Sequence, residues 1–135
     1  MTTPLSDAIP IRTTEDIVKV RKVVRIKAAE IGLGLVDQTK IVTAASELAR
    51  NTLDYGGGGE MSVSLVAESG RKGLRLTFRD EGPGIADLEQ ALRDGFTSGG
   101  GLGLGLGGAK RLCNEFHIES APGKGTRVTI ARWKQ

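Results

Sequence analysis

Hydrophobic positions in the first third of the chain recur with the spacing of a helix. Between residues 13 and 34 they fall three or four positions apart, with lysines and arginines on the other faces; the apolar set is Ile17, Val20, Val24, Ala28 and Ile31. This spacing predicts an amphipathic helix that begins at Thr13 or Thr14 and ends at Gly32 or Gly34. Acidic residues directly after the threonines strengthen the predicted start. We interpret the basic face as ordinary solvated surface.

A second helical pattern runs from Asp37, which is expected to cap the helix, to Tyr55. Its predicted buried stripe consists of Ile41, Ala44, Ala45, Leu48 and Thr52. Glu47 and Asn51 are four residues apart and therefore share one face beside this stripe. An amide oxygen can ligate Mg²⁺, and a carboxylate one turn away can accept a proton from a hydroxyl. Taken alone, the pair is more typical of an exposed helical face.

Alternating apolar and polar positions predict strands in the rest of the chain. Residues 60–67 and 73–80 form a predicted hairpin, residues 117–120 and 126–133 a predicted terminal pair, and residues 5–12 a predicted edge strand limited by two prolines. Two more helices are expected, at residues 87–96 and 105–116. The only histidine, His117, falls in a strand pattern and is interpreted as a packed or edge residue.

Glycine is the one unusual feature of the composition, with 20 residues of 135, and seven of them lie within residues 99–108. Many free backbone N–H groups in a glycine-rich segment favour an anionic ligand such as a phosphate. A flexible linker is the alternative, but leucines at 102, 104 and 106 and the helical pattern that follows argue against it. Asp80 precedes a Gly-Pro-Gly segment at a predicted strand end, which by itself equally fits a plain turn.

The remaining composition narrows the class of protein. A chain of 135 residues is expected to form one domain spanning residues 1–135. A net charge of +3 with few aromatic residues does not favour nucleic-acid binding. No apolar run is long enough to span a membrane and no signal peptide is recognised, so we expect a cytoplasmic protein. The single cysteine, Cys113, excludes an internal disulfide and is interpreted as a small buried residue.

Four segments together resemble a known series of nucleotide-binding motifs. In chain order they are ELARN at 47–51, DEGPGI at 80–85, the glycine run at 99–108 and GKGT at 123–126. Their order and spacing resemble the N, G1, G2 and G3 boxes of the Bergerat-fold ATPases of the gyrase, Hsp90, histidine kinase and MutL type. Within that superfamily the chain is most similar to the serine/threonine switch kinases of the bacterial stressosome, with the anti-sigma factor kinases as near cousins.

The resemblance implies an α/β (α+β) two-layer sandwich, with a mixed β-sheet, helices packed on one face and a glycine-rich ATP lid. It implies ATP and Mg²⁺ as cofactors, with Glu47 as general base and Asn51 as the metal ligand. Asp80 would accept a hydrogen bond from the adenine amino group. The implied ATP-binding residues are Asn51, Asp80, Gly82, Gly84, Gly101, Gly103, Leu104, Gly105 and Thr126.

The implied activity is phosphorylation of serine or threonine on STAS-domain proteins, followed by activation of a PP2C-type phosphatase or another regulator. Asp54 stands where many histidine kinases carry a lysine, so phosphate charge would be neutralised by Mg²⁺ and the lid. An anti-sigma factor kinase that binds a sigma factor directly is one alternative. A non-catalytic module whose binding is gated by ATP is the other.

Overall fold

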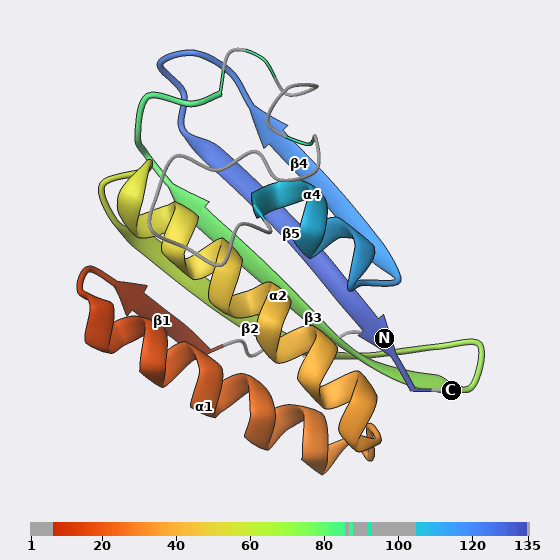
Figure 1. The fold of residues 1–135 in the computed structure, drawn as a ribbon. Coiled ribbons are helices and arrows are strands. Elements are labelled where there is room, and N and C mark those ends of the chain that lie inside the picture. The colour runs from red at the N-terminus through yellow and green to blue at the C-terminus, as the bar shows by residue number, and fades with distance from the viewer. Residues whose placement is uncertain (1–6, 86, 88–91, 93–104, 135) are drawn as a thin grey trace.

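A five-stranded sheet with helices on one face forms the frame of the protein (Figure 1). The structure is a computed structural model that describes residues 7–85, 87, 92 and 105–134. Its elements are β1 (Asp7–Ile11), α1 (Thr14–Glu30), α2 (Leu35–Asp54), β2 (Gly59–Glu68), β3 (Arg71–Asp80), α4 (Gly105–Arg111), β4 (Glu115–Ser120) and β5 (Thr126–Trp133). The predicted two-layer architecture, the edge strand, the hairpin and the terminal strand pair are confirmed.

The strands follow the order β1-β2-β3-β5-β4, and all four pairings between these strands are antiparallel. The mixed character expected for the sheet is therefore corrected for the described strands. The reason lies in the last hairpin: β4 enters at the sheet edge after α4, and the following turn returns β5 beside β3 in the opposite direction.

Helix α1 begins and ends where its sequence predicts. The Thr13 side chain accepts the Asp16 N–H at 3.3 Å, and the Asp16 carboxylate accepts the Thr13 N–H at 3.1 Å. This reciprocal capping box satisfies two backbone donors that the first turn leaves free. After Ile31 the chain turns at Gly32, whose φ of +86° is a conformation that favours glycine.

Helix α2 starts earlier than expected. Gly34 occupies the N-cap position, so the prediction that Asp37 caps this helix is wrong. Asp37 instead lies in the first turn, where a negative charge is favourable near the helix N-terminus. Its carboxylate faces the sheet and accepts two hydrogen bonds from Arg132 on β5, at 2.6 Å and 3.0 Å. Asp37 therefore forms an ion pair with Arg132 on β5 and does not cap its own helix.

The core lies between the helices and the sheet. All five residues predicted as the buried stripe of α2 are buried, and α2 packs against α1 on one side and α4 on the other (Figure 1). Leu106 and Ala109 bring α4 into the same core as Leu74, Leu76 and Phe78 of β3. In the part of the chain that the structure describes, no helix combines the length and apolar character needed to cross a membrane.

Helix α4 is shorter than its sequence predicts, ending at Arg111 instead of residue 116. The Asn114 N–H binds the Ala131 carbonyl at 2.9 Å, and Glu115 and Phe116 pair with β5 in strand β4. Sheet pairing at the edge of the molecule has overridden the helical pattern there. The helix predicted at residues 87–96 lies outside the described residues, apart from positions 87 and 92.

Arg132 joins three elements at the end of the sheet opposite Asp80. Besides the two bonds to Asp37 on α2, its guanidinium donates to the Leu112 carbonyl just after α4 at 3.1 Å. The exposed fractions of the Arg132 and Asp37 side chains are 12% and 20%, so the pair is shielded from most solvent. Arg132 consequently fixes the end of α4 relative to the start of α2.

We predict that Arg132→Leu lowers the free energy of unfolding by about 2 kcal/mol, because it leaves Asp37 largely desolvated without its partner and frees the Leu112 carbonyl. Urea denaturation followed by circular dichroism would measure the change. Arg21→Leu is the matched control, since Arg21 is exposed and makes no ion pair with any described residue. Equal stability of the wild type and Arg132→Leu would contradict the assigned role.

Candidate active site

The end of the sheet carries a row of polar residues on the helix-covered face. Asp80, the last residue of β3, lies opposite Gly59 on β2 and opposite Thr126 on β5, and Thr126 in turn lies opposite Ser120 on β4. Directly paired residues of antiparallel strands share a face. Since Phe78 and Val128, two positions away, are buried in the core, the Asp80–Thr126–Ser120 row faces the helices.

The Asp80 carboxylate sits in a tight backbone environment. Its Oδ1 accepts the Gly82 N–H at 2.9 Å. Burial raises the pKa of Asp80, while backbone N–H groups of Gly82 and Thr126 partly offset that increase. A Cβ added at Gly56 would overlap the Asp80 side chain, so a larger residue there would displace the carboxylate. Gly56 was not predicted as a site residue, because its role comes from this close approach across the sheet end.

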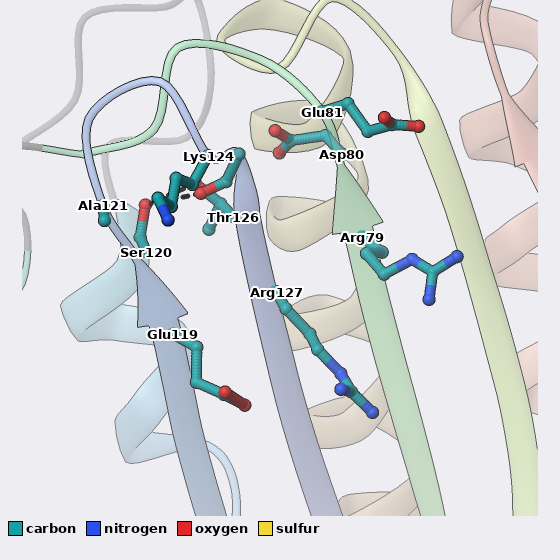
Figure 2. A pocket seen from close by; sticks show the side chains of 10 residues that line it. Arg79, Asp80, Glu81, Glu119, Ser120, Ala121, Lys124, Thr126 and Arg127 are labelled. Carbon is teal, nitrogen blue, oxygen red and sulfur yellow. Dashed lines mark hydrogen bonds between the residues drawn. The ribbon is translucent and has the colours of Figure 1, made fainter.

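Residues 82–85 are fastened to the turn between β4 and β5. The Ser120 hydroxyl accepts the Ile85 N–H at 2.8 Å, and the Gly123 N–H binds the Pro83 carbonyl at 2.7 Å. Ser120 and Thr126 are also hydrogen-bonded to each other at 2.8 Å (Figure 2). Gly84 adopts a φ of +79° against the Ala121 carbonyl, where a Cβ would not fit.

Ser120 thus holds the loop after Asp80, a role that the sequence analysis did not assign. Its signal in the sequence was its position at the end of an alternating strand, on the same side as Phe116 and Ile118.

Helix α2 brings the second half of the site together. Glu47 is only 6% exposed, which excludes a plain surface carboxylate, and its Oε1 accepts the Gly105 N–H at 3.2 Å. Asn51, one turn later, is half-buried, and its backbone carbonyl accepts the Gly56 N–H at 3.3 Å. Gly56 in turn abuts Asp80. The helix therefore connects the start of α4 with the Asp80 row through consecutive contacts.

The expected lid residues are described only in part. Gly105 opens α4 and Leu106 is buried in the core, whereas Gly101, Gly103 and Leu104 lie outside the described residues. An open cavity of about 590 Å³ at this end of the sheet has Asp80, Ser120 and Thr126 in its lining (Figure 2). Glu47 and Asn51 do not line it. The cavity thus covers only the Asp80 side of the expected site and extends toward the opposite face of the sheet.

The described residues could supply few ligands to a metal ion, so most of its coordination would come from nucleotide phosphates and water. Within residues 7–85, 87, 92 and 105–134 there is no group of three or more His, Cys, Asp or Glu positioned to bind a metal. Mg²⁺ in phosphoryl-transfer sites commonly takes one or two protein oxygens and completes its shell with water and phosphate oxygens. Asn51, one helical turn from the buried Glu47, fits such a single-oxygen role.

Two other reactive side chains lie away from this site. Burial raises the pKa of the Cys113 thiol to about 12, so the thiolate nucleophile is scarce at neutral pH. Cys113 follows α4 instead of lying within it, and it is half-buried. His117 lies on the edge strand β4 with its side chain 70% exposed and 3.5 Å from Glu119. Its expected position as an edge residue is confirmed.

Comparison with known sequences identifies the class of protein. Residues 36–135 match the family described as "Histidine kinase-, DNA gyrase B-, and HSP90-like ATPase". The match covers most of the chain, and the chain belongs to this ATPase family. ATP is accordingly the nucleotide that it uses.

Individual relatives narrow the class further. The chain is 46% identical over 125 residues to "Serine/threonine-protein kinase RsbT" of Bacillus subtilis strain 168, covering 93% of this chain and 94% of that protein. It is 30% identical over 118 residues to "Anti-sigma F factor" of Thermoanaerobacter sp. strain X514, covering 84% and 82% of the two chains. Within the ATPase family this chain is of the RsbT type of serine/threonine-protein kinases.

A solved structure supports the fold. The chain superimposes with a TM-score of 0.64 and 25% identity on the crystal structure of the RsbU and RsbW domains of a Mycobacterium tuberculosis protein. The aligned part covers 96% of this chain and 32% of that longer one. The likeness confirms that the helices and the sheet belong to one known arrangement.

We predict that Asp80→Asn stabilises the protein in the absence of nucleotide at neutral pH. The pKa of Asp80 is raised by burial, so the proton is bound more tightly in the folded state than in the unfolded state. Proton binding by Asp80 therefore stabilises the folded protein fully at a pH below the pKa of this group in the unfolded state. The stabilisation is lost as the pH rises through the higher pKa of Asp80 in the folded state. Asparagine is neutral at every pH, and its Oδ1 can still accept the Gly82 N–H.

Thermal unfolding between pH 4 and pH 7.5 would test this prediction. The advantage of Asp80→Asn over the wild type should increase from the acidic to the neutral end of this range. A variant that is less stable than the wild type at pH 7.5 would show that the carboxylate contributes net stabilisation there.

Proposed function

We propose that this chain transfers the γ-phosphoryl group of Mg-ATP to a serine or threonine hydroxyl on a STAS-domain partner protein. The observation that carries the proposal is the buried carboxylate of Glu47, which lies at the start of α4 and one helical turn from Asn51. A buried acid beside the glycine-rich segment of an ATPase-family kinase is suited to receive a proton. The similarity to RsbT over nearly the whole chain supports a protein as the phosphoryl acceptor.

In this proposal Asp80 selects the nucleotide base. Its ionised carboxylate would accept a hydrogen bond from the adenine amino group, and Thr126 would line the same side. The Gly82 N–H already binds Oδ1 and so fixes the orientation of the carboxylate. The loop after Asp80 is held by Ser120 and by the turn at Gly123, so the backbone around the base is positioned before the ligand arrives.

Glu47 would act as the general base. Its Oε1 is engaged by the Gly105 N–H, and no hydrogen bond from a described residue engages Oε2. As the acceptor oxygen bonds to the γ-phosphorus and the bond from the γ-phosphorus to ADP breaks, the hydroxyl proton passes to Glu47. Gly105, with Gly101, Gly103 and Leu104, would contribute backbone N–H groups to the phosphates. Asn51 would hold Mg²⁺, which supplies charge neutralisation at the phosphates when it is bound.

The downstream part of the proposal rests on similarity alone. After phosphorylating its STAS-domain partner in the cytoplasm, the protein would be released to activate a PP2C-type phosphatase or another regulator. The resemblance to anti-sigma F factors favours one second candidate, a kinase that binds a sigma factor directly. A non-catalytic ATP-gated binding module remains the alternative that a transfer assay would reveal.

Intact-mass analysis tests the function most directly. The protein, Mg-ATP and a STAS-domain protein from the same organism should yield a STAS product heavier by one phosphoryl group, on the order of 80 Da. Asp80→Asn should bind ATP more weakly by about 1.5 to 3 kcal/mol and so slow the transfer at limiting ATP. An unmodified STAS protein with bound ATP would favour the binding module, and co-purification of a sigma factor would favour the second kinase class.

We predict that Glu47→Gln retains nucleotide binding and the link to Gly105, because the amide oxygen can still accept the N–H, but loses phosphoryl transfer by about 100-fold or more. Glu47→Ala should lose transfer and also destabilise the start of α4. Calorimetry with ATP, stability measurements and single-turnover transfer separate these effects.

Asn51→Ala serves as the contrasting variant. It should weaken binding of ATP in the presence of Mg²⁺ while leaving the Gly105 contact in place. Transfer at the wild-type rate by Glu47→Gln would assign the base to another residue.

A further inference from the structure

The sheet face opposite the helices carries two neighbouring arginines at the same end as the Asp80 row. Arg79 on β3 and Arg127 on β5 are direct cross-strand partners. Glu60 on β2 lies opposite Arg79, and Glu119 on β4 lies opposite Arg127. Because successive residues of a strand point to opposite faces, these side chains project away from Asp80, Thr126 and Ser120. No described helix covers this face (Figure 1).

Neither arginine is neutralised. Among the described residues, neither the Arg79 nor the Arg127 side chain forms a hydrogen bond or an ion pair, and Glu119 lies instead 3.5 Å from His117. The same face shows that pairing is possible, because Arg75 reaches Glu115 at 3.2 Å. Each arginine has the other arginine on one side and a glutamate on the other, Glu60 beside Arg79 and Glu119 beside Arg127. Neither guanidinium is held by a carboxylate of the described residues, so both can donate to a bound anion.

Both arginines line the cavity of about 590 Å³ described above. Figure 2 shows their side chains extending in the same direction from neighbouring strands, with Lys124 in the turn at the end of the cavity. We call this part of the cavity the arginine groove; its residues are Arg79, Arg127, Lys124, Glu81 and Glu119. The whole cavity is lined by three cations and by three carboxylates, the third being Asp80, and the two arginines lie on adjacent strands.

We propose that the arginine groove binds a phosphate-monoester group carried on a protein side chain. Two planar guanidinium groups side by side match the oxygens of a phosphate, to which each can donate two parallel hydrogen bonds. Glu81 and Glu119 oppose any anionic ligand, and a phosphate more than a carboxylate. The preference for phosphate rests on its three acceptor oxygens, which can engage both guanidinium groups at once, whereas a carboxylate has two.

The neighbouring surface has room for the peptide on which the phosphate is carried. The next row on this face consists of short hydroxyl side chains and one histidine, Ser62, Thr77, Thr129 and His117. Thr77 and Thr129 contact each other at 3.5 Å and leave a low surface beyond the arginines. The groove faces away from Glu47 and the Asp80 row, so this proposal does not depend on the proposed kinase reaction.

A fluorescein-labelled peptide, Gly-Gly-phosphoserine-Gly-Gly, would test the groove by fluorescence anisotropy. It should bind the wild type, and Arg79→Gln or Arg127→Gln should each weaken the binding by about tenfold or more. Arg21→Gln removes the same charge from exposed helix α1 and should change affinity less than twofold. Both groove positions are exposed, and thermal unfolding would verify that the variants fold.

The controls make each outcome decisive. The unphosphorylated peptide should not bind, and inorganic phosphate should compete only weakly; equal competition would indicate a general anion site and overturn the assignment to a protein-borne phosphate. Saturating ADP should leave peptide binding intact, because displacement would place the peptide in the nucleotide site. Absence of binding at millimolar peptide, or unchanged affinity in both arginine variants, would also overturn the proposal.

Discussion

The hydrogen bond from the Gly105 N–H to the Glu47 carboxylate, at 3.2 Å, is the contact on which the two halves of the site depend. A carboxylate that is 6% exposed needs a donor, since an unpaired buried acid is strongly unfavourable. The first backbone N–H groups of a helix lack partners within the helix, so α4 can supply that donor. One bond therefore satisfies both groups and joins α2 to the last part of the glycine run, where α4 begins.

The position of Glu47 follows from packing on the residues around it. Leu48, Ala44 and Ala45 are buried, and the 3.6-residue period turns Glu47 toward the side of α2 that contacts α4. Arg132 fixes the other end of α4 through the Leu112 carbonyl while it pairs with Asp37 at the start of α2. The short helix α4 is thus held at both ends by residues that are far away in sequence.

Local patterns predicted α1, α2, the hairpin and the terminal strands because the burial of each is decided by its own periodicity. Asp37 and the length of α4 were mispredicted because the deciding partners, Arg132 and the backbone of Ala131, lie on β5. In the site, Glu47 and Asp80 could be proposed from motif resemblance. Gly56 and Ser120 could not, since their importance comes from close approach across the sheet end.

The same three strand ends present different chemistry on their two faces. At each strand end, two residues that are adjacent in sequence project to opposite faces of the sheet. The pairs are Arg79 with Asp80, Arg127 with Thr126, and Glu119 with Ser120. Proximity alone does not couple two ligands, because coupling requires an element that both ligands bias. The β3–β5 ladder is paired from Gly73 to Asp80 and is poorly suited to that role.

The turn at residues 121–125 is better suited to couple the two faces. It contacts Pro83 beside the site and carries Lys124 in the arginine groove. A ligand on either face would influence the other only to the extent that its binding shifts this turn.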